Sequence, residues 1–219
     1  MTATYVIGDA PVLSHGAWRN NAELIADVAR LGYLRSEWRT LDPTYGLGRF
    51  WTLWRPERLV ASDVDPARSP TGRSVDATAT PWASRSFDAV VLDPPFKLNG
   101  TSTGRGASVS DDDYGVGGPN VSWQDRHALI EAMITEATRV LRPGGVLLVK
   151  CQDQVCSGQV RWQTRIFADH AESLGHRLVD RFDLSSYRAQ PVGRSQVHAR
   201  RNTSTLLVLR LERPWWRHC

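Results

Sequence analysis

Short apolar runs suited to β-strands alternate along this chain with segments that have the hydrophobic spacing of α-helices. The strand-like runs occupy residues 38–43, 57–66, 73–78, 86–95, 144–153, 176–184 and 203–212. Helical patterns occupy residues 19–31, 125–141 and 161–174, and a further helix is expected from the turn after residue 43 to about residue 55. Such alternation favours a mostly parallel sheet with helices on both faces. The last two runs have no helix between them, so we expect an α/β fold whose seven-stranded sheet has an antiparallel last strand.

At 219 residues the chain has the length of one domain, and we predict a single domain over residues 1–219. Two polar stretches interrupt the pattern of strands and helices within it. Residues 97–122 are crowded with Gly, Ser and Asp, and residues 184–203 contain four arginines, one histidine and no acid. Loops of this length tend to be functional or disordered. Both stretches are therefore candidate substrate-facing loops.

The charge of the chain favours an anionic partner mainly in its C-terminal part. The net charge is +4, and residues 151–219 contain 11 basic and 6 acidic side chains. Three cysteines without metal-ligand spacing predict neither a disulfide framework nor a metal site and favour a reducing compartment. The N-terminal segment lacks the pattern of a secretory signal, and no apolar stretch approaches the roughly 18 residues of a membrane span. We therefore expect a cytoplasmic protein with no metal and no membrane partner.

Acidic residues follow the first three strand-like runs. Asp42 ends the first run and precedes a turn that contains Gly46 and Gly48, Asp63 and Asp65 end the second, and Asp76 ends the third. Each feature alone fits an ordinary strand-to-helix turn or a helix cap. Ligands of open α/β sheets bind at the carboxyl ends of the strands, where glycines allow close approach and an acid accepts hydrogen bonds from ribose hydroxyls. Their recurrence therefore favours a nucleotide-like ligand.

The fourth run ends in Asp93-Pro94-Pro95-Phe96. Prolines restrict the backbone and can hold a carboxylate and an aromatic ring in a defined arrangement, which suits a planar polar group. The alternative interpretation is a proline turn with Phe96 in the core and Asp93 as a cap. The three upstream strand ends favour the first interpretation.

With these motifs the sequence resembles the class I S-adenosylmethionine-dependent methyltransferases, whose amino-methyltransferases carry the signature (D/N/S)PP(Y/F/W). The stretch "DPTYGLGRF" at residues 42–50 also resembles the DPxxGxGxF motif of the N6-adenine DNA methylases. The resemblance implies a Rossmann-like class I methyltransferase fold with S-adenosylmethionine as cofactor. The residues that it implies for cofactor binding are Asp42, Pro43, Tyr45, Gly46, Gly48, Asp63 and Asp76.

The same resemblance implies transfer of a methyl group to the N6 amine of a flipped adenine in DNA. Asp93 and the carbonyl of Pro94 would accept the two amine N–H groups, Pro95 would stiffen the turn and Phe96 would stack on the base. The residues expected to contact substrate are Lys97, Asn99, Arg188, Arg194, Arg200 and Arg201. A solvated loop is an equally open interpretation of these six positions.

Three alternatives remain open at this point. Several RNA enzymes that methylate base amines also use Asp-Pro-Pro-aromatic, and a protein-glutamine methyltransferase usually begins the motif with Asn. A third alternative is a nucleic-acid-binding module that has kept the fold and lost catalysis, although intact Asp42, Gly46 and Asp93 speak against it. Cys151 and Cys156 are interpreted as buried, inert thiols.

Overall fold

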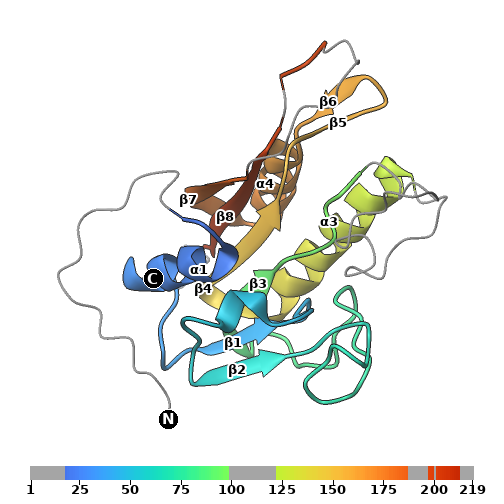
Figure 1. Ribbon diagram of the computed structural model, residues 1–219. Helices are drawn as coiled ribbons and strands as arrows, with labels where there is room; N and C mark the ends of the chain where they lie inside the picture. The colour runs from blue at the N-terminus through green and yellow to red at the C-terminus, as the bar shows by residue number, and fades with distance from the viewer. Residues whose placement is uncertain (1–17, 99–121, 187–196, 200, 213–219) are drawn as a thin grey trace, which may run out of the picture.

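A computed structural model describes residues 18–98, 122–186, 197–199 and 201–212. Figure 1 shows the elements that these residues form. They are α1 (Asn21–Arg30), β1 (Arg39–Asp42), the 3-10 turn η1 (Arg49–Trp51), β2 (Arg58–Ala61), β3 (Phe87–Leu92), α3 (Trp123–Val140), β4 (Leu141–Cys151), β5 (Gln154–Cys156), β6 (Gln159–Arg161), α4 (Gln163–Ser173), β7 (His176–Ser185) and β8 (Thr203–Leu211).

The described part of the chain forms a six-stranded sheet in the order β2-β1-β3-β4-β8-β7 and a separate two-stranded hairpin of β5 and β6. Strands β2, β1, β3 and β4 are parallel, and β8 runs antiparallel to both of its neighbours, β4 and β7. The predicted mostly parallel sheet with an antiparallel last strand is therefore confirmed. From β1 the chain goes first to β2 on one side and then to β3 on the other, so β1 and β3 flank a topological switch point.

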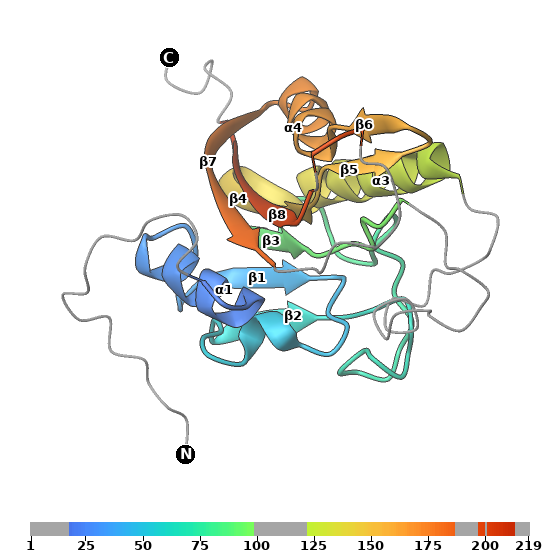
Figure 2. The same ribbon diagram turned by 45° about the horizontal axis from the view of Figure 1, so that its top comes forward.

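Helices cover both faces of the sheet, as predicted (Figures 1 and 2). On one face, Ile130 and Ile134 of α3 and Phe167 of α4 pack with the strand residues Val90 and Leu147. On the other face, a second cluster joins α1 and η1 to the sheet, and it includes Leu24, Ile25, Val28, Phe50, Val91, Leu148 and Val208. Alternate residues of each strand thus belong to opposite cores, because successive strand side chains point to opposite faces.

The predicted third strand at residues 73–78 is wrong. The segment makes one isolated bridge, between Asp63 and Ser74, and is otherwise irregular. Pro66, Pro70 and Gly72 precede it closely and keep the chain in turns, leaving too short a stretch to continue a ladder. Among the residues that the structure describes, the sheet therefore has six strands in place of seven.

One further expectation is wrong, and one element of the structure was not expected. The helix expected to reach about residue 55 is only the three-residue turn η1, and the positive φ angles of Gly46 and Gly48 interrupt helical geometry directly before it. Residues 154–161 form an antiparallel hairpin that was not predicted. Its turn contains Ser157 and Gly158, both with positive φ, and Figure 1 shows it extending beyond the end of β4.

An ionic contact attaches the irregular connection between β2 and β3 to α3. The buried carboxylate of Glu136 accepts hydrogen bonds from the backbone N–H and the hydroxyl of Thr80, and it pairs with Arg139 at 2.6 Å. Arg139 also donates to the carbonyls of Thr80 and Trp82. The connection that carries Asp76 is therefore held against α3 although it lacks regular structure.

Candidate functional site

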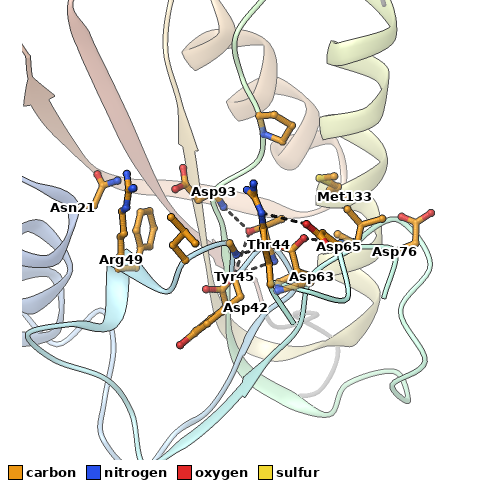
Figure 3. Close-up of a pocket in the computed structure, with 18 of the residues that line it drawn as sticks. Asn21, Asp42, Thr44, Tyr45, Arg49, Asp63, Asp65, Asp76, Asp93 and Met133 are labelled. Atoms are coloured by element: carbon orange, nitrogen blue, oxygen red, sulfur yellow. Dashed lines mark hydrogen bonds and ion pairs between the residues drawn. The ribbon is translucent and has the colours of Figure 1, made fainter. Parts of the chain in front are cut away.

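The carboxyl ends of β1, β2 and β3 border a hollow of about 530 Å³, which we call the first hollow. Figure 3 shows the side chains that surround it. Of the residues predicted for cofactor binding, six line it, and they are Asp42, Pro43, Tyr45, Gly46, Asp63 and Asp76. Asp93 and Pro95 line it as well. Residues from three separate strand ends therefore meet at the switch point of the sheet, where ligands of such folds bind.

Asp42 is the buried anchor of the turn that follows β1. One carboxylate oxygen accepts a hydrogen bond from the indole N–H of Trp51 at 2.7 Å, and the other accepts from the backbone N–H of Thr44 at 3.0 Å and from its hydroxyl at 3.2 Å. Burial raises the pKa of Asp42 to about 7 against these hydrogen bonds, and the nearby carboxylate of Asp93 adds to the rise. Asp42 thus holds the turn and Thr44 in place.

The glycine-containing turn is tied to the end of β2. The backbone N–H of Gly46 donates to Oδ2 of Asp63 at 2.8 Å, and the backbone N–H of Asp65 donates to Oδ1 at 2.9 Å. Both oxygens of Asp63 therefore order backbone around the first hollow. Gly48 has a φ of 66°, and a Cβ atom there would lie 2.5 Å from the hydroxyl of Tyr45. Gly48 does not line the hollow but leaves room for the Tyr45 ring, which does.

Asp76 lies at the outer end of the first hollow and is exposed. Its Oδ1 atom accepts hydrogen bonds from the backbone N–H of Thr78 at 2.8 Å and from the Thr78 hydroxyl at 2.7 Å. Apolar side chains of Ala77, Leu129 and Met133 line the same hollow. This combination of carboxylates and an apolar wall suits a ligand that has both hydroxyl or amine donors and a flat ring.

Asp93 follows β3 and is held by the turn after β1. Its backbone N–H donates to the Thr44 hydroxyl at 2.8 Å, so Thr44 links Asp42 to Asp93. Burial raises the pKa of Asp93 to about 6, and the ammonium of Lys150 opposes the rise. In Figure 3, Asp93 lies between Arg49 on one side and Asp63 on the other.

The rest of the motif is clamped from two other elements. The carbonyl of Phe96 accepts hydrogen bonds from the side-chain amides of Gln154 at 2.7 Å and Gln163 at 2.9 Å. Pro94 is buried, and Phe96 is half-buried and packs partly against the core. The alternative interpretation of Phe96 as a core residue is thus partly right, since one side of the ring packs and another side remains available.

A second hollow of about 560 Å³ adjoins the first one on the α1 face of the sheet. The two hollows share Asn21, Arg49 and Asp93. The second is also lined by Phe96 and Lys150, together with Leu184 of β7 and Ser204 of β8. Asp93 is therefore exposed to two neighbouring compartments.

The remaining predicted substrate residues do not gather at this site. Lys97 is half-buried and lines neither hollow. The guanidinium of Arg201 lies over the ring of Trp162 at 4.6 Å, and His198 contacts the carbonyl of Gly158 in the β5–β6 hairpin at 2.9 Å. Asn99, Arg188, Arg194 and Arg200 lie outside the described residues.

Several lining residues were missed by the sequence interpretation. Thr44, Asn21 and Arg49 carry no local signal, because they reach the site only through the packing of α1 and of the turn after β1. Lys150 does carry one, since it is a lone charge inside the apolar run "GVLLVKC" of β4.

Cys151 and Cys156 are buried free thiols, as predicted, and burial raises the pKa of Cys151.

Two other kinds of feature are absent from the described ranges. None of their helices combines the length and the apolar character needed to cross a lipid bilayer. Within the same ranges, no three His, Cys, Asp or Glu side chains are grouped so that they could hold a metal ion.

Comparison with known proteins identifies the fold. No protein-family model and no curated protein matches the chain. Among solved structures, it is similar to a Galdieria sulphuraria protein provisionally assigned as a sarcosine dimethylglycine methyltransferase, with a TM-score of 0.53 and 12% identity over 88% of this chain and 85% of that one. TrmN from Thermus thermophilus gives a TM-score of 0.53 and 17% identity over 89% of this chain but only 51% of TrmN.

A third similar structure comes from an enzyme that catalyses a different reaction. The [4+2]-cyclase SpnF gives a TM-score of 0.50 and 16% identity over 92% of this chain and 87% of that one. At such identities the likeness concerns the fold, which is the Rossmann-like fold of class I methyltransferases. A methyltransferase-like fold that also supports a cyclase cannot assign the reaction, so the reaction must be argued from the site.

Proposed function

We propose that this protein is an S-adenosylmethionine-dependent methyltransferase that transfers the methyl group to the exocyclic N6 amine of adenine in DNA. The observation that carries the proposal is the position of Asp93, whose side chain borders both hollows. A residue in that position can contact a methyl acceptor in one compartment while the methyl donor occupies the other. The Asp-Pro-Pro-Phe motif supports an amine of a planar base as the acceptor.

The residues around the first hollow fit S-adenosylmethionine. The hollow has about the volume of a small-ligand site. Asp63 and Asp76 have oxygen lone pairs available for ribose hydroxyls and an adenine amine, and Leu129 and Met133 offer an apolar surface to the ring. When bound, the cofactor would supply a methyl group already activated on a sulfonium.

The protein then has to position the acceptor and localise its lone pair. The lone pair of an adenine amine is delocalised into the ring, which makes the amine a poor nucleophile. We infer that Asp93 and the carbonyl of Pro94 accept its two N–H groups and favour a tetrahedral nitrogen that faces the methyl group. Phe96 would stack on the base, a contact worth roughly 1–3 kcal/mol, and this offsets part of the cost of extruding the base from a duplex. No covalent enzyme intermediate is required.

The pH dependence of turnover is expected to follow the ionisation of Asp93. The carboxylate accepts an N–H more strongly than the neutral acid does, and its pKa is raised to about 6 by burial. Turnover should therefore rise with pH through about 6 and fall roughly tenfold from that plateau at pH 5. Steady-state rates between pH 5 and 8 would measure this, and Asp93→Asn should flatten that part of the profile. An unchanged profile in Asp93→Asn would assign the titration to another group, such as Asp42.

The contribution of Asp93 to folding stability should fall with rising pH, whereas turnover should rise. The pKa of Asp93 is raised in the folded state, so its ionisation opposes folding. The protonated side chain of Asp93 makes its full contribution to the free energy of unfolding below about pH 4, which is the pKa of aspartate in the unfolded chain. This contribution is lost as pH rises through about 6, the pKa of Asp93 in the folded protein. Denaturant unfolding of wild type and Asp93→Asn at pH 4 and 7 would measure it, since the difference between the two proteins should shift in favour of Asp93→Asn at pH 7.

Replacement of Gly48 tests the role of the Tyr45 ring. Gly48→Ala should destabilise the fold by about 1 kcal/mol because its φ is positive, and it should also displace Tyr45 and weaken cofactor binding several-fold. Gly72→Ala is the matched control, since Gly72 has a φ of 69° and nothing lies within 4 Å of an added Cβ atom. Denaturant unfolding and calorimetry with S-adenosylmethionine measure both effects. Equal cofactor affinity in the two variants would contradict the prediction that Gly48→Ala weakens binding by displacing Tyr45.

The proposed function is tested by transfer of labelled methyl from S-adenosylmethionine to DNA, RNA and protein, followed by nucleoside analysis of the labelled pool. N6-methyladenine in DNA is the expected product. Label in RNA would keep the chemistry and change the substrate. Absence of label from all three pools, with no calorimetric heat on addition of S-adenosylmethionine, would favour a module that binds nucleic acid without catalysis.

A further inference from the structure

The second hollow contains a charged group that the proposed transfer does not use. Lys150 lies in β4 and only 1% of its surface is exposed, yet its side chain helps to line this hollow. Its Nζ atom has no hydrogen-bond partner within the part of the chain that the structure describes. A buried ammonium without a partner is costly. An acceptor atom brought into the hollow by a ligand would offset that cost.

The register of the sheet places Lys150 beside Asp93. Leu92 of β3 pairs with Val149 of β4 in parallel, so the next residues along the two strands are Asp93 and Lys150. Val91 and Leu148 belong to the core on the α1 face, and alternation puts Asp93 and Lys150 on that same face. Neighbouring strands are roughly 4.8 Å apart. An acceptor and a donor therefore stand side by side at the edge of the second hollow.

The groups around Lys150 keep it charged and leave its N–H groups available to a ligand. Burial lowers the pKa of Lys150 to about 8, against the opposing effect of Asp93 and, more weakly, of Cys151 and Asp183. Asp183 is already engaged, since it accepts hydrogen bonds from Thr205 and Arg181, both at 2.6 Å. The ammonium form is thus present at neutral pH, and Lys150 has three N–H groups to donate.

We propose that Lys150 determines the substrate by donating a hydrogen bond to a ring nitrogen next to the amine that Asp93 holds. This inference rests on the proposed function and extends it to the choice of base. The amine of adenine is flanked by N1 and N7, which are both acceptors, so one edge of the base offers a donor beside an acceptor. Asp93 and Lys150 present the complementary pattern. Donation to a ring nitrogen withdraws electron density from the amine and makes it a weaker nucleophile. The role of Lys150 is therefore to recognise and orient the base and not to activate the amine.

The test compares adenine with 1-deazaadenine and 7-deazaadenine, each placed at the target position of the same oligonucleotide. Wild type should lose about 10-fold to 100-fold in kcat/KM on the analogue that lacks the contacted nitrogen. Lys150→Met should show a similar loss on adenine and no further loss on that analogue, because its contact is already missing. Lys150→Arg should recover part of the discrimination. Ratios between proteins cancel the intrinsic reactivity of each analogue.

Controls separate this role from a structural one. Lys150→Met keeps most of the side-chain volume and removes a buried charge, so it should fold, and calorimetry should show affinity for S-adenosylmethionine within about threefold of wild type. Wild type that treats adenine and both analogues alike would overturn the inference even if the variant failed to fold. So would a variant that loses activity equally on all three bases. Absence of methyl transfer to any nucleic acid by wild type would instead overturn the proposed function and this inference with it.

Discussion

Asp93→Ala is expected to lower kcat for methyl transfer by roughly 10²–10³-fold while the affinity for S-adenosylmethionine stays within about threefold. The substitution removes the acceptor that we assign to the amine N–H. It leaves the cofactor side intact, because only the backbone N–H of Asp93 takes part in the hydrogen bond to Thr44. Single-turnover transfer to DNA and calorimetry with the cofactor measure the two quantities separately.

The variant is also expected to fold well. The side chain of Asp93 has a pKa raised by burial, so its removal takes away a cost of ionisation near neutral pH. Asp169→Ala is a suitable control, because this carboxylate lies on the exposed side of α4 with 63% of its side chain accessible. Near-normal single-turnover rates in Asp93→Ala would show that the amine is activated by another group.

Asp63→Ala is expected to weaken cofactor binding and to leave kcat nearly unchanged, which is the reverse of the effect expected for Asp93→Ala. The affinity for S-adenosylmethionine should fall by about 100-fold or more, since hydrogen bonds to a charged carboxylate are worth roughly 1.5–3 kcal/mol each. Asp63 accepts from the backbone N–H groups of Gly46 and Asp65, so its loss both loosens the turn and removes the acceptor assigned to ribose. At saturating cofactor, kcat should change by less than about fivefold, because the acceptor site is untouched.

An isosteric variant sharpens this second test. In Asp63→Asn one of the two backbone N–H groups would face the amide NH₂ in place of an oxygen, so Asn should restore only part of the affinity. Calorimetric titration of wild type, Asp63→Ala, Asp63→Asn and the Asp169→Ala control gives the comparison. Full affinity in Asp63→Asn would mean that the charge and the double acceptance by Asp63 are unimportant. A drop in kcat as large as that of Asp93→Ala would contradict the division of the site into two compartments.

Strong local patterns predicted most of the fold. The helices α1, α3 and α4 begin and end within two residues of their predicted limits, because amphipathic spacing and capping residues act over a few positions. The third strand failed because prolines and a glycine nearby outweighed a short apolar run. The β5–β6 hairpin failed because its strands are three residues each and too short to carry a period. The extent of the domain over residues 1–219 and the roles of the loops at 97–122 and 184–203 stay predictions.

The sequence by itself determined the chemical types at the strand ends and their order along the chain. Parallel strands of one sheet bring their carboxyl ends to one edge, so Asp42, Asp63 and Asp93 could be expected to meet, and the first hollow brings them together. Asp76 lines the same hollow from the irregular connection between β2 and β3, because that connection is held against α3. Only the tertiary structure decided which face of the sheet each side chain meets and what stands beside it. The register of β3 against β4 makes Asp93 and Lys150 neighbours, although they lie 57 positions apart in the chain. A contact of that kind depends on strand pairing and on the packing of α1, α3 and α4 against the sheet, and no local sequence pattern encodes it.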